Sequence, residues 1–117
     1  MNDFFEELSF SSSNRQTTAL DEIPHGYGKF GWEATNPIPI ASVFENKVYL
    51  QKLRTEDNRP VTCQRTGSLK SENIIDIIDR YEIYNADGDF LGYLYLCPYH
   101  LKTSDKIPEG LLQVKEL

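Results

Sequence analysis

The feature that most constrains the fold of this chain is a pair of alternating segments joined at Asp87-Gly88. The segments read IDRYEIYNA (78–86) and DFLGYLYLC (89–97). Asp-Gly between two alternating runs is the preferred signal for a β-hairpin with a two-residue type I′ turn. In the expected register, residue 80 pairs with 95, 82 with 93 and 84 with 91. This hairpin is the strongest local prediction that the sequence makes.

The predicted hairpin has one apolar and one amphipathic face. The apolar face is expected to be core and carries Tyr81, Ile83, Phe90, Leu94 and Leu96. The amphipathic face carries Arg80, Glu82, Tyr84, Leu91, Tyr93, Tyr95 and Cys97. Tyrosine is enriched in protein interfaces because it combines a large rigid area with a polar tip. The candidate partner-binding residues are therefore Tyr84, Tyr93, Tyr95, Glu82, Asp76 and Asp79. The alternative is an ordinary half-exposed sheet face, where tyrosine is also common.

Other segments predict further strands. KVYLQKLR (47–54) and VTCQRT (61–66) flank a polar turn and suit a hairpin with a longer loop. SENIID (71–76) fits either a short helix or a strand, since its isoleucines allow both. LLQVKEL (111–117) suits one more strand, and the prolines and glycines within 24–40 predict irregular structure.

A length of 117 residues indicates one domain. The predicted fold class is α+β or mainly β, with a twisted antiparallel sheet of four to six strands and a peripheral short helix. Residues 1–22 are expected to form an N-terminal arm, with a short helix over 3–9 and a polar linker. Residues 23–117 are expected to form the single globular domain.

The charge is acidic overall and unevenly distributed. The net charge is −6, from 18 acidic and 12 basic residues, yet residues 46–70 hold six bases and only two acids. An acidic chain argues against general nucleic-acid or anionic-membrane binding. The favoured explanation of the uneven charge is that the basic middle packs against acidic strands. The alternative is that the acidic ends meet a basic partner.

No apolar run reaches the length of a membrane span, and the N-terminus lacks the basic start and apolar core of a signal peptide. A cytoplasmic location is therefore expected. Two cysteines do not make a disulfide framework, and a reducing compartment keeps them as thiols.

Gly26, Gly28 and Gly31 have the G-x-G-x-x-G spacing of dinucleotide-binding loops. That motif requires a buried strand before it and a helix after it, whose N-terminus meets the phosphates. Here prolines stand on both sides of the motif, at residues 24, 37 and 39. The sequence therefore predicts a loop in which glycine lets the backbone pass close to aromatic side chains.

Four side chains form a candidate zinc site, although no cofactor is expected on balance. Cys97 and His100 have metal-ligand spacing, and Cys63 and His25 would complete a tetrahedral set. The competing interpretation makes Cys63 a small core residue. Cys97 with His100 is also conceivable as a nucleophile and base, but residues three apart on a strand point to opposite faces.

Two further candidates are weaker. Residues 85–89 resemble part of a calcium loop, but its twelfth position is Leu96 where the bidentate glutamate should stand. Arg54, Arg65, Lys52 and Arg59 could together hold a phosphate or carboxylate. Exposed charges that protect a sheet edge are the commoner explanation.

From Gly28 onward the chain resembles a group of small bacterial proteins of no characterised activity. The resemblance rests on NPIP (36–39), VYLQKLRT (48–55), QRTGS (64–68), IDRYEIY (78–84) and LYLCPYH through IPEG (94–110), and it covers about three quarters of the chain. It supplies no catalytic residues. Small soluble proteins of this kind often look like immunity proteins encoded beside bacterial toxins.

The resemblance thus implies a non-enzymatic protein that binds and neutralises a toxin. The acidic ends of the chain indicate that the toxin domain is basic. Two other functions remain open. One is a zinc protein or enzyme that uses Cys63, Cys97 and His100, and the other is a structural or assembly subunit. The sequence does not assign an oligomeric state.

Overall fold

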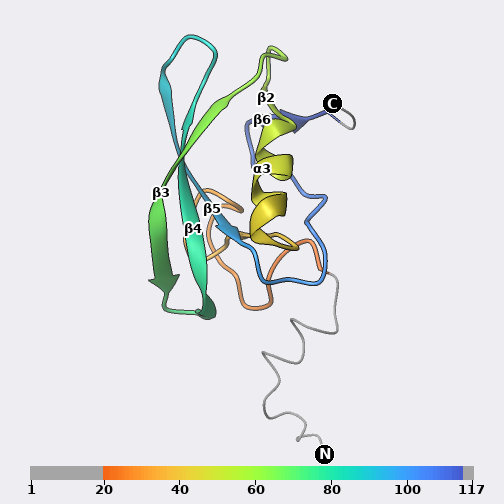
Figure 1. Ribbon diagram of the computed structural model, residues 1–117, viewed down its shortest axis with the longest axis vertical. Helices are drawn as coiled ribbons and strands as arrows, with labels where there is room; N and C mark the ends of the chain where they lie inside the picture. The colour runs from red at the N-terminus through yellow and green to blue at the C-terminus, as the bar shows by residue number, and fades with distance from the viewer. Residues whose placement is uncertain (1–19, 115–117) are drawn as a thin grey trace, which may run out of the picture.

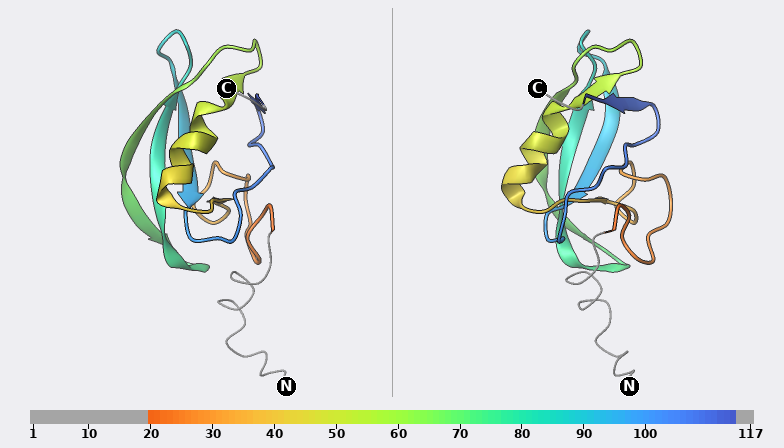
Figure 2. Two further views of the ribbon diagram at one scale, coloured as in Figure 1. Left: turned by 45° about the vertical axis from the view of Figure 1, so that its right-hand side comes forward. Right: turned by 90° about the vertical axis from the view of Figure 1, so that its right-hand side faces the viewer.

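The computed structural model describes residues 20–114, and it confirms the α+β class. A four-stranded sheet in the order β1-β5-β4-β3 carries one helix, α3, against one face, and a separate two-stranded sheet pairs β2 with β6 (Figures 1 and 2). The predicted helix at 3–9 lies outside the described residues. The elements are β1 (Ile38–Pro39), α3 (Val43–Gln51), β2 (Leu53–Thr55), β3 (Thr62–Ser71), β4 (Ile74–Tyr84), β5 (Phe90–Cys97) and β6 (Leu111–Gln113).

The hairpin of β4 and β5 is the centre of the sheet. Arg80 pairs with Tyr95 and Glu82 with Tyr93, as predicted, but Tyr84 pairs with Phe90 because of an irregularity after Ile83. The turn also differs from type I′. The Asn85 N–H donates to the Asp89 carbonyl at 2.9 Å, and only Gly88 in the loop has a positive φ, of 88°. A three-residue loop with glycine in the left-handed position joins the strands instead.

The predicted hairpin of 47–54 with 61–66 is wrong. Most of its first segment is helix α3, which begins after Ser42. The Ser42 hydroxyl accepts a hydrogen bond from the Glu45 N–H at 3.2 Å, so Ser42-Val-Phe-Glu45 has the spacing and part of the geometry of a capping box. This local signal outweighs the apparent apolar alternation over 47–54.

The strands on either side of α3 pair with distant segments. β2 pairs with β6, so Leu53 lies opposite Gln113, and β3 pairs with β4. β6 confirms the predicted C-terminal strand as far as Gln113. The ambiguous segment 71–76 is divided between the end of β3, a turn and the start of β4. Sequence reasoning missed β1, which pairs in parallel with the end of β5.

The core lies between α3 and the face of the sheet that we call the inner face. Tyr49 and Leu50 of α3 belong to one buried cluster with Ile83 and Leu94 from the central strands. Since side chains alternate along a strand, the even-numbered residues from Arg80 to Tyr84 on β4 point to the opposite side, the outer face. Sequence reasoning placed the division between these faces correctly for Tyr81, Ile83, Leu94 and Leu96, all of which are buried.

Candidate functional site

Four aromatic side chains follow one another along the outer face, and we call them the outer-face cluster: Tyr84, Phe90, Tyr93 and Tyr95. The ring centroids of Tyr84 and Phe90 are 5.6 Å apart, and those of Phe90 and Tyr93 are 5.3 Å apart with an edge-on geometry. Phe90 is 51% exposed, and the three tyrosines are partly exposed. The prediction that Phe90 is core is therefore wrong. The irregularity that pairs Phe90 with Tyr84 brings its ring to the outer face.

Two charged residues hold the rings of this cluster. The Tyr84 hydroxyl donates to Glu82 Oε1 at 2.8 Å, and this hydrogen bond raises the pKa of Tyr84. The Arg80 guanidinium lies 4.5 Å from the centroid of the Tyr93 ring, a cation–π distance. Arg80 Nε also donates to the Thr66 hydroxyl at 2.9 Å. The contacts with Glu82 and Arg80 thus restrict the orientations of the Tyr84 and Tyr93 rings.

The two other acids predicted for this surface lie elsewhere. Asp79 points to the inner face and is only 6% exposed, so it is not available to a partner. Its carboxylate accepts hydrogen bonds from Asn46 Nδ2 at 2.9 Å, Arg65 Nη2 at 3.0 Å and the Ser68 hydroxyl at 3.2 Å. Asp76 lines a pocket at the first residues of β4, away from the aromatic rings. Glu82, in contrast, accepts a hydrogen bond from Tyr84 of the cluster.

The basic middle of the chain packs against acidic residues of the hairpin, which was the favoured explanation of the uneven charge. Arg59 lies 2.9 Å from Asp87 Oδ2, and Arg65 reaches Asp79. Hydrogen bonds from Arg59 lower the pKa of Asp87. Arg54 instead donates to the carbonyl oxygens of Gln51 and Leu53. These arginines therefore do not converge on one shared anion site.

The glycine-rich stretch is a loop without a following helix, as the sequence predicted. The Lys29 N–H donates to Glu33 Oε2 at 3.2 Å, so a carboxylate of the chain itself occupies this backbone donor of the loop. Trp32 packs against Gly92, where an added Cβ would lie 3.2 Å from the indole ring. The indole N–H donates to the Glu109 carbonyl at 2.9 Å. Trp32 of this loop therefore links β5 to the segment before β6.

The four candidate zinc ligands do not form one site. Cys63 lies opposite Ile83, which pairs with Gly92, and Cys97 stands five residues farther along β5. At a rise of about 3.4 Å per residue, the two thiols are about 17 Å apart along the strands alone. Within residues 20–114, no three His, Cys, Asp or Glu side chains are placed to share a metal ion.

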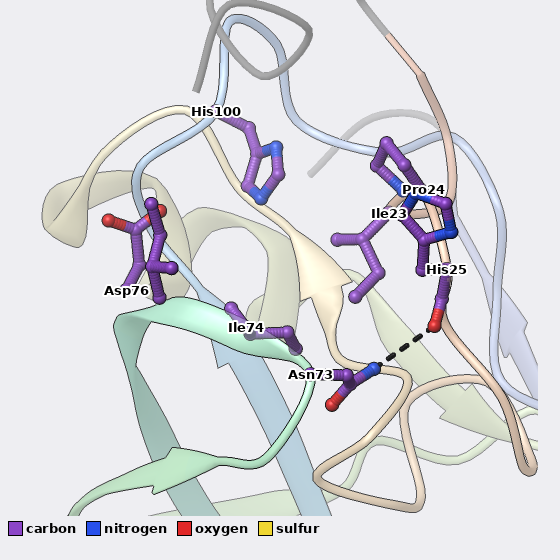
Figure 3. A pocket seen from close by; sticks show the side chains of 8 residues that line it. Ile23, Pro24, His25, Asn73, Ile74, Asp76 and His100 are labelled. Carbon is purple, nitrogen blue, oxygen red and sulfur yellow. Dashed lines mark hydrogen bonds between the residues drawn. The ribbon is translucent and has the colours of Figure 1, made fainter. Parts of the chain in front are cut away.

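The two histidines do line one pocket, of about 100 Å³ (Figure 3). His25 comes from the loop before β1 and His100 from the segment after β5, and Ile23 and Ile74 form part of the apolar wall. Asn73 Nδ2 donates to the His25 carbonyl at 3.1 Å and so ties this loop to the start of β4. Neither cysteine lines the pocket.

The residues that resemble a calcium loop close the hairpin. Asn85 Oδ1 accepts hydrogen bonds from the backbone N–H groups of Asp87 and Asp89, each at 2.9 Å. The Asp87 carboxylate is engaged by Arg59. These contacts account for the local sequence as turn chemistry.

Cys63 is a half-buried thiol on the inner face, and burial raises its pKa to about 11. Since only the thiolate is nucleophilic, we expect the folded protein to resist alkylation of Cys63. At pH 8, iodoacetamide should modify Cys63 on the order of a hundred times more slowly than a free cysteine. Mass spectrometry of the native and urea-unfolded protein over time measures the difference. Equal alkylation rates in the native and unfolded protein would contradict the raised pKa of Cys63.

A groove between α3 and β3 was not predicted from the sequence. It has a volume of about 400 Å³ and is lined by Lys47 and Leu50 of α3 and by Cys63, Arg65 and Tyr81 of the sheet, among others. The sequence prediction missed this groove because it placed 47–54 in a strand. The capping box at Ser42 was the local evidence for the helix that forms one wall.

Comparison with known proteins identified no relative of this chain. No protein-family model, curated protein or solved structure matches this chain. Between residues 20 and 114, no helix is both long and apolar enough to cross a membrane.

Proposed function

We propose that this protein is a non-enzymatic binding protein that masks a basic partner, in the way that an immunity protein masks a bacterial toxin. The observation that carries the proposal is the outer-face cluster, in which an exposed phenylalanine stands among three partly exposed tyrosines. Binding energy in protein interfaces is concentrated in a few aromatic and arginine side chains surrounded by polar groups. Arg80 and Glu82 provide such polar groups within and beside the cluster.

The contacts of the cluster favour tight binding. Ordering a flexible side chain at an interface costs about 0.5–1.5 kcal/mol. The Tyr84–Glu82 hydrogen bond and the stacking of Arg80 on Tyr93 order these side chains in the free protein. Much of that cost is therefore met on folding, and the rings offer a surface that needs little rearrangement.

The net charge supports a basic partner. The chain carries a charge of −6, and an acidic protein attracts a basic one over distances up to the Debye length. Arg59 and Arg65 form internal ion pairs with Asp87 and Asp79. Each pair cancels one positive and one negative charge, so the net negative charge of the chain is unchanged.

The proposal is tested by coexpressing the tagged protein with the product of the neighbouring reading frame. We expect stoichiometric co-purification of a basic protein that is toxic when expressed alone. The affinity should fall as salt is raised, because screening weakens electrostatic attraction. Failure of any basic protein to co-purify, or an affinity indifferent to salt, would overturn the proposal.

Substitutions in the outer-face cluster should weaken the complex. We expect Phe90→Ala and Tyr93→Ala each to raise the Kd at least about tenfold, since central aromatic residues dominate interface energies. Phe44→Ala and Tyr99→Ala are matched controls, because these side chains are 72% and 50% exposed but lie outside the cluster. Isothermal titration calorimetry measures the Kd values. A complex that tolerates both cluster variants would place the interface elsewhere.

A further inference from the structure

We propose that the groove between α3 and β3 binds a small monocarboxylate with an apolar tail, such as a medium-chain fatty acid. The groove lies on the inner side of the sheet, whereas the outer-face cluster lies on the other side. The proposal therefore goes beyond the proposed function and does not depend on it. The volume of the groove, about 400 Å³, lies within the range of small-ligand sites.

The floor of the groove is apolar. Leu50 is only 5% exposed and belongs to the core cluster, and Val61 and Cys63 pack against that cluster from the sheet side. The Cys63 thiol carries no charge at neutral pH. This floor favours a hydrocarbon chain, because each buried methylene group contributes about 0.8 kcal/mol.

The charged and hydroxyl groups of the groove are hydrogen-bond donors. Lys47 is exposed at one side and makes no ion pair with the part of the chain that the structure describes. Arg65 uses Nη2 for Asp79 and Ser68, which leaves Nε and Nη1 without a hydrogen bond to residues 20–114. The Tyr81 oxygen accepts a long hydrogen bond of 3.4 Å from Asn46 Nδ2, so its own proton remains to be donated.

Lys47 and Arg65 are exposed to water in the free protein, and a ligand acceptor would replace that water. The carboxylate of Asp79, which Arg65 contacts, already accepts three hydrogen bonds. A ligand carboxylate matches the donors because it has two acceptor oxygens and a charge opposite to that of Lys47 and Arg65. A volume of 400 Å³ holds about a dozen water-sized atoms, which suits a chain of about eight carbons with its carboxylate.

The experiment is a titration of the folded protein with octanoate, followed by amide chemical shifts in NMR spectra. We expect saturable shifts confined to residues 47–51, 61–65 and around 81. 1-Octanol should bind at least about tenfold more weakly because it carries no charge for the donors. No saturable shift in these residues up to about 10 mM octanoate, or equal binding of octanol, would overturn the proposal.

A charge-matched pair of variants tests the role of Lys47. Lys47→Gln should weaken octanoate binding at least about fivefold by removing the unpaired cation at the groove. Lys70→Gln changes the net charge equally but lies outside the groove, so it should bind octanoate as the parent does. Both lysines are exposed, and neither variant should affect folding. Equal affinity of the two variants would contradict recognition by Lys47.

Discussion

Gly31→Ala is expected to lower the free energy of unfolding by about 3 kcal/mol. Gly31 has a φ of +79°, which costs a residue with a Cβ about 1–2 kcal/mol. An added Cβ would also lie 2.8 Å from Pro108 Cγ and 3.1 Å from Ile38 Cδ1. Both neighbours are fully buried, and a proline ring cannot swing aside as a flexible side chain does. Crowding of this kind costs a further 1–3 kcal/mol, roughly.

Gly110→Ala is the matched control for this prediction. Gly110 has a similar φ of +91°, but no atom lies within 4 Å of an added Cβ. Its substitution should therefore cost only the backbone contribution, about 1–2 kcal/mol. Urea denaturation followed by circular dichroism measures both values. Equal losses in the two variants would show that the contact with Pro108 and Ile38 does not restrict residue 31.

Asp79→Ala is expected to lower the free energy of unfolding by about 3 kcal/mol. The Asp79 carboxylate accepts a hydrogen bond from Asn46, a residue of α3 whose side chain is fully buried. Without Asp79, the Asn46 amide keeps only the 3.4 Å contact to Tyr81, and Asn46 Oδ1 already lacks a hydrogen bond. Arg65 is half-exposed, so water can solvate its charge when the partner is lost. The main cost is therefore the buried amide.

A double-mutant cycle with Asn46→Ala tests this explanation. Removing both partners should cost less than the sum of the single losses, by about 1–2 kcal/mol, because no buried amide then remains unpaired. Ser68→Ala is the control, since Ser68 is exposed and should cost less than about 1 kcal/mol. Losses that add within about 0.5 kcal/mol would show that Asn46 and Asp79 are not coupled.

The candidate site was only partly predictable from the sequence. Alternation along β4 correctly placed Tyr84 and Glu82 on one face, and it also placed Tyr93 and Tyr95 beside them on β5. Phe90 was misplaced because the turn has three residues and the strand an irregularity, and a one-residue change reverses the face of a side chain. Asp79 was assigned to the surface although its odd number already placed it with Tyr81. Its acidity was given more weight than its position in the alternation.

Helix α3 was missed because short apolar segments fit both strand and helix periods. KVYLQKLR alternates well enough for a strand, yet Asn46, Tyr49 and Leu50 follow the helical spacing and are the residues that α3 buries. The cap at Ser42 distinguishes the two structures locally. The groove depends on that helix, and so no reading of 47–54 as a strand could have predicted it.

The sequence by itself determined the α+β class, the central hairpin and the shared burial of Tyr81, Ile83, Leu94 and Leu96. These features follow from alternation with a period of two, which is a local property of the chain. Only the tertiary structure decided that β2 pairs with β6, that Asp79 is buried opposite Asn46, and that α3 and β3 leave a groove between them. Such contacts join segments tens of residues apart, and a local pattern does not encode which distant segment completes each surface.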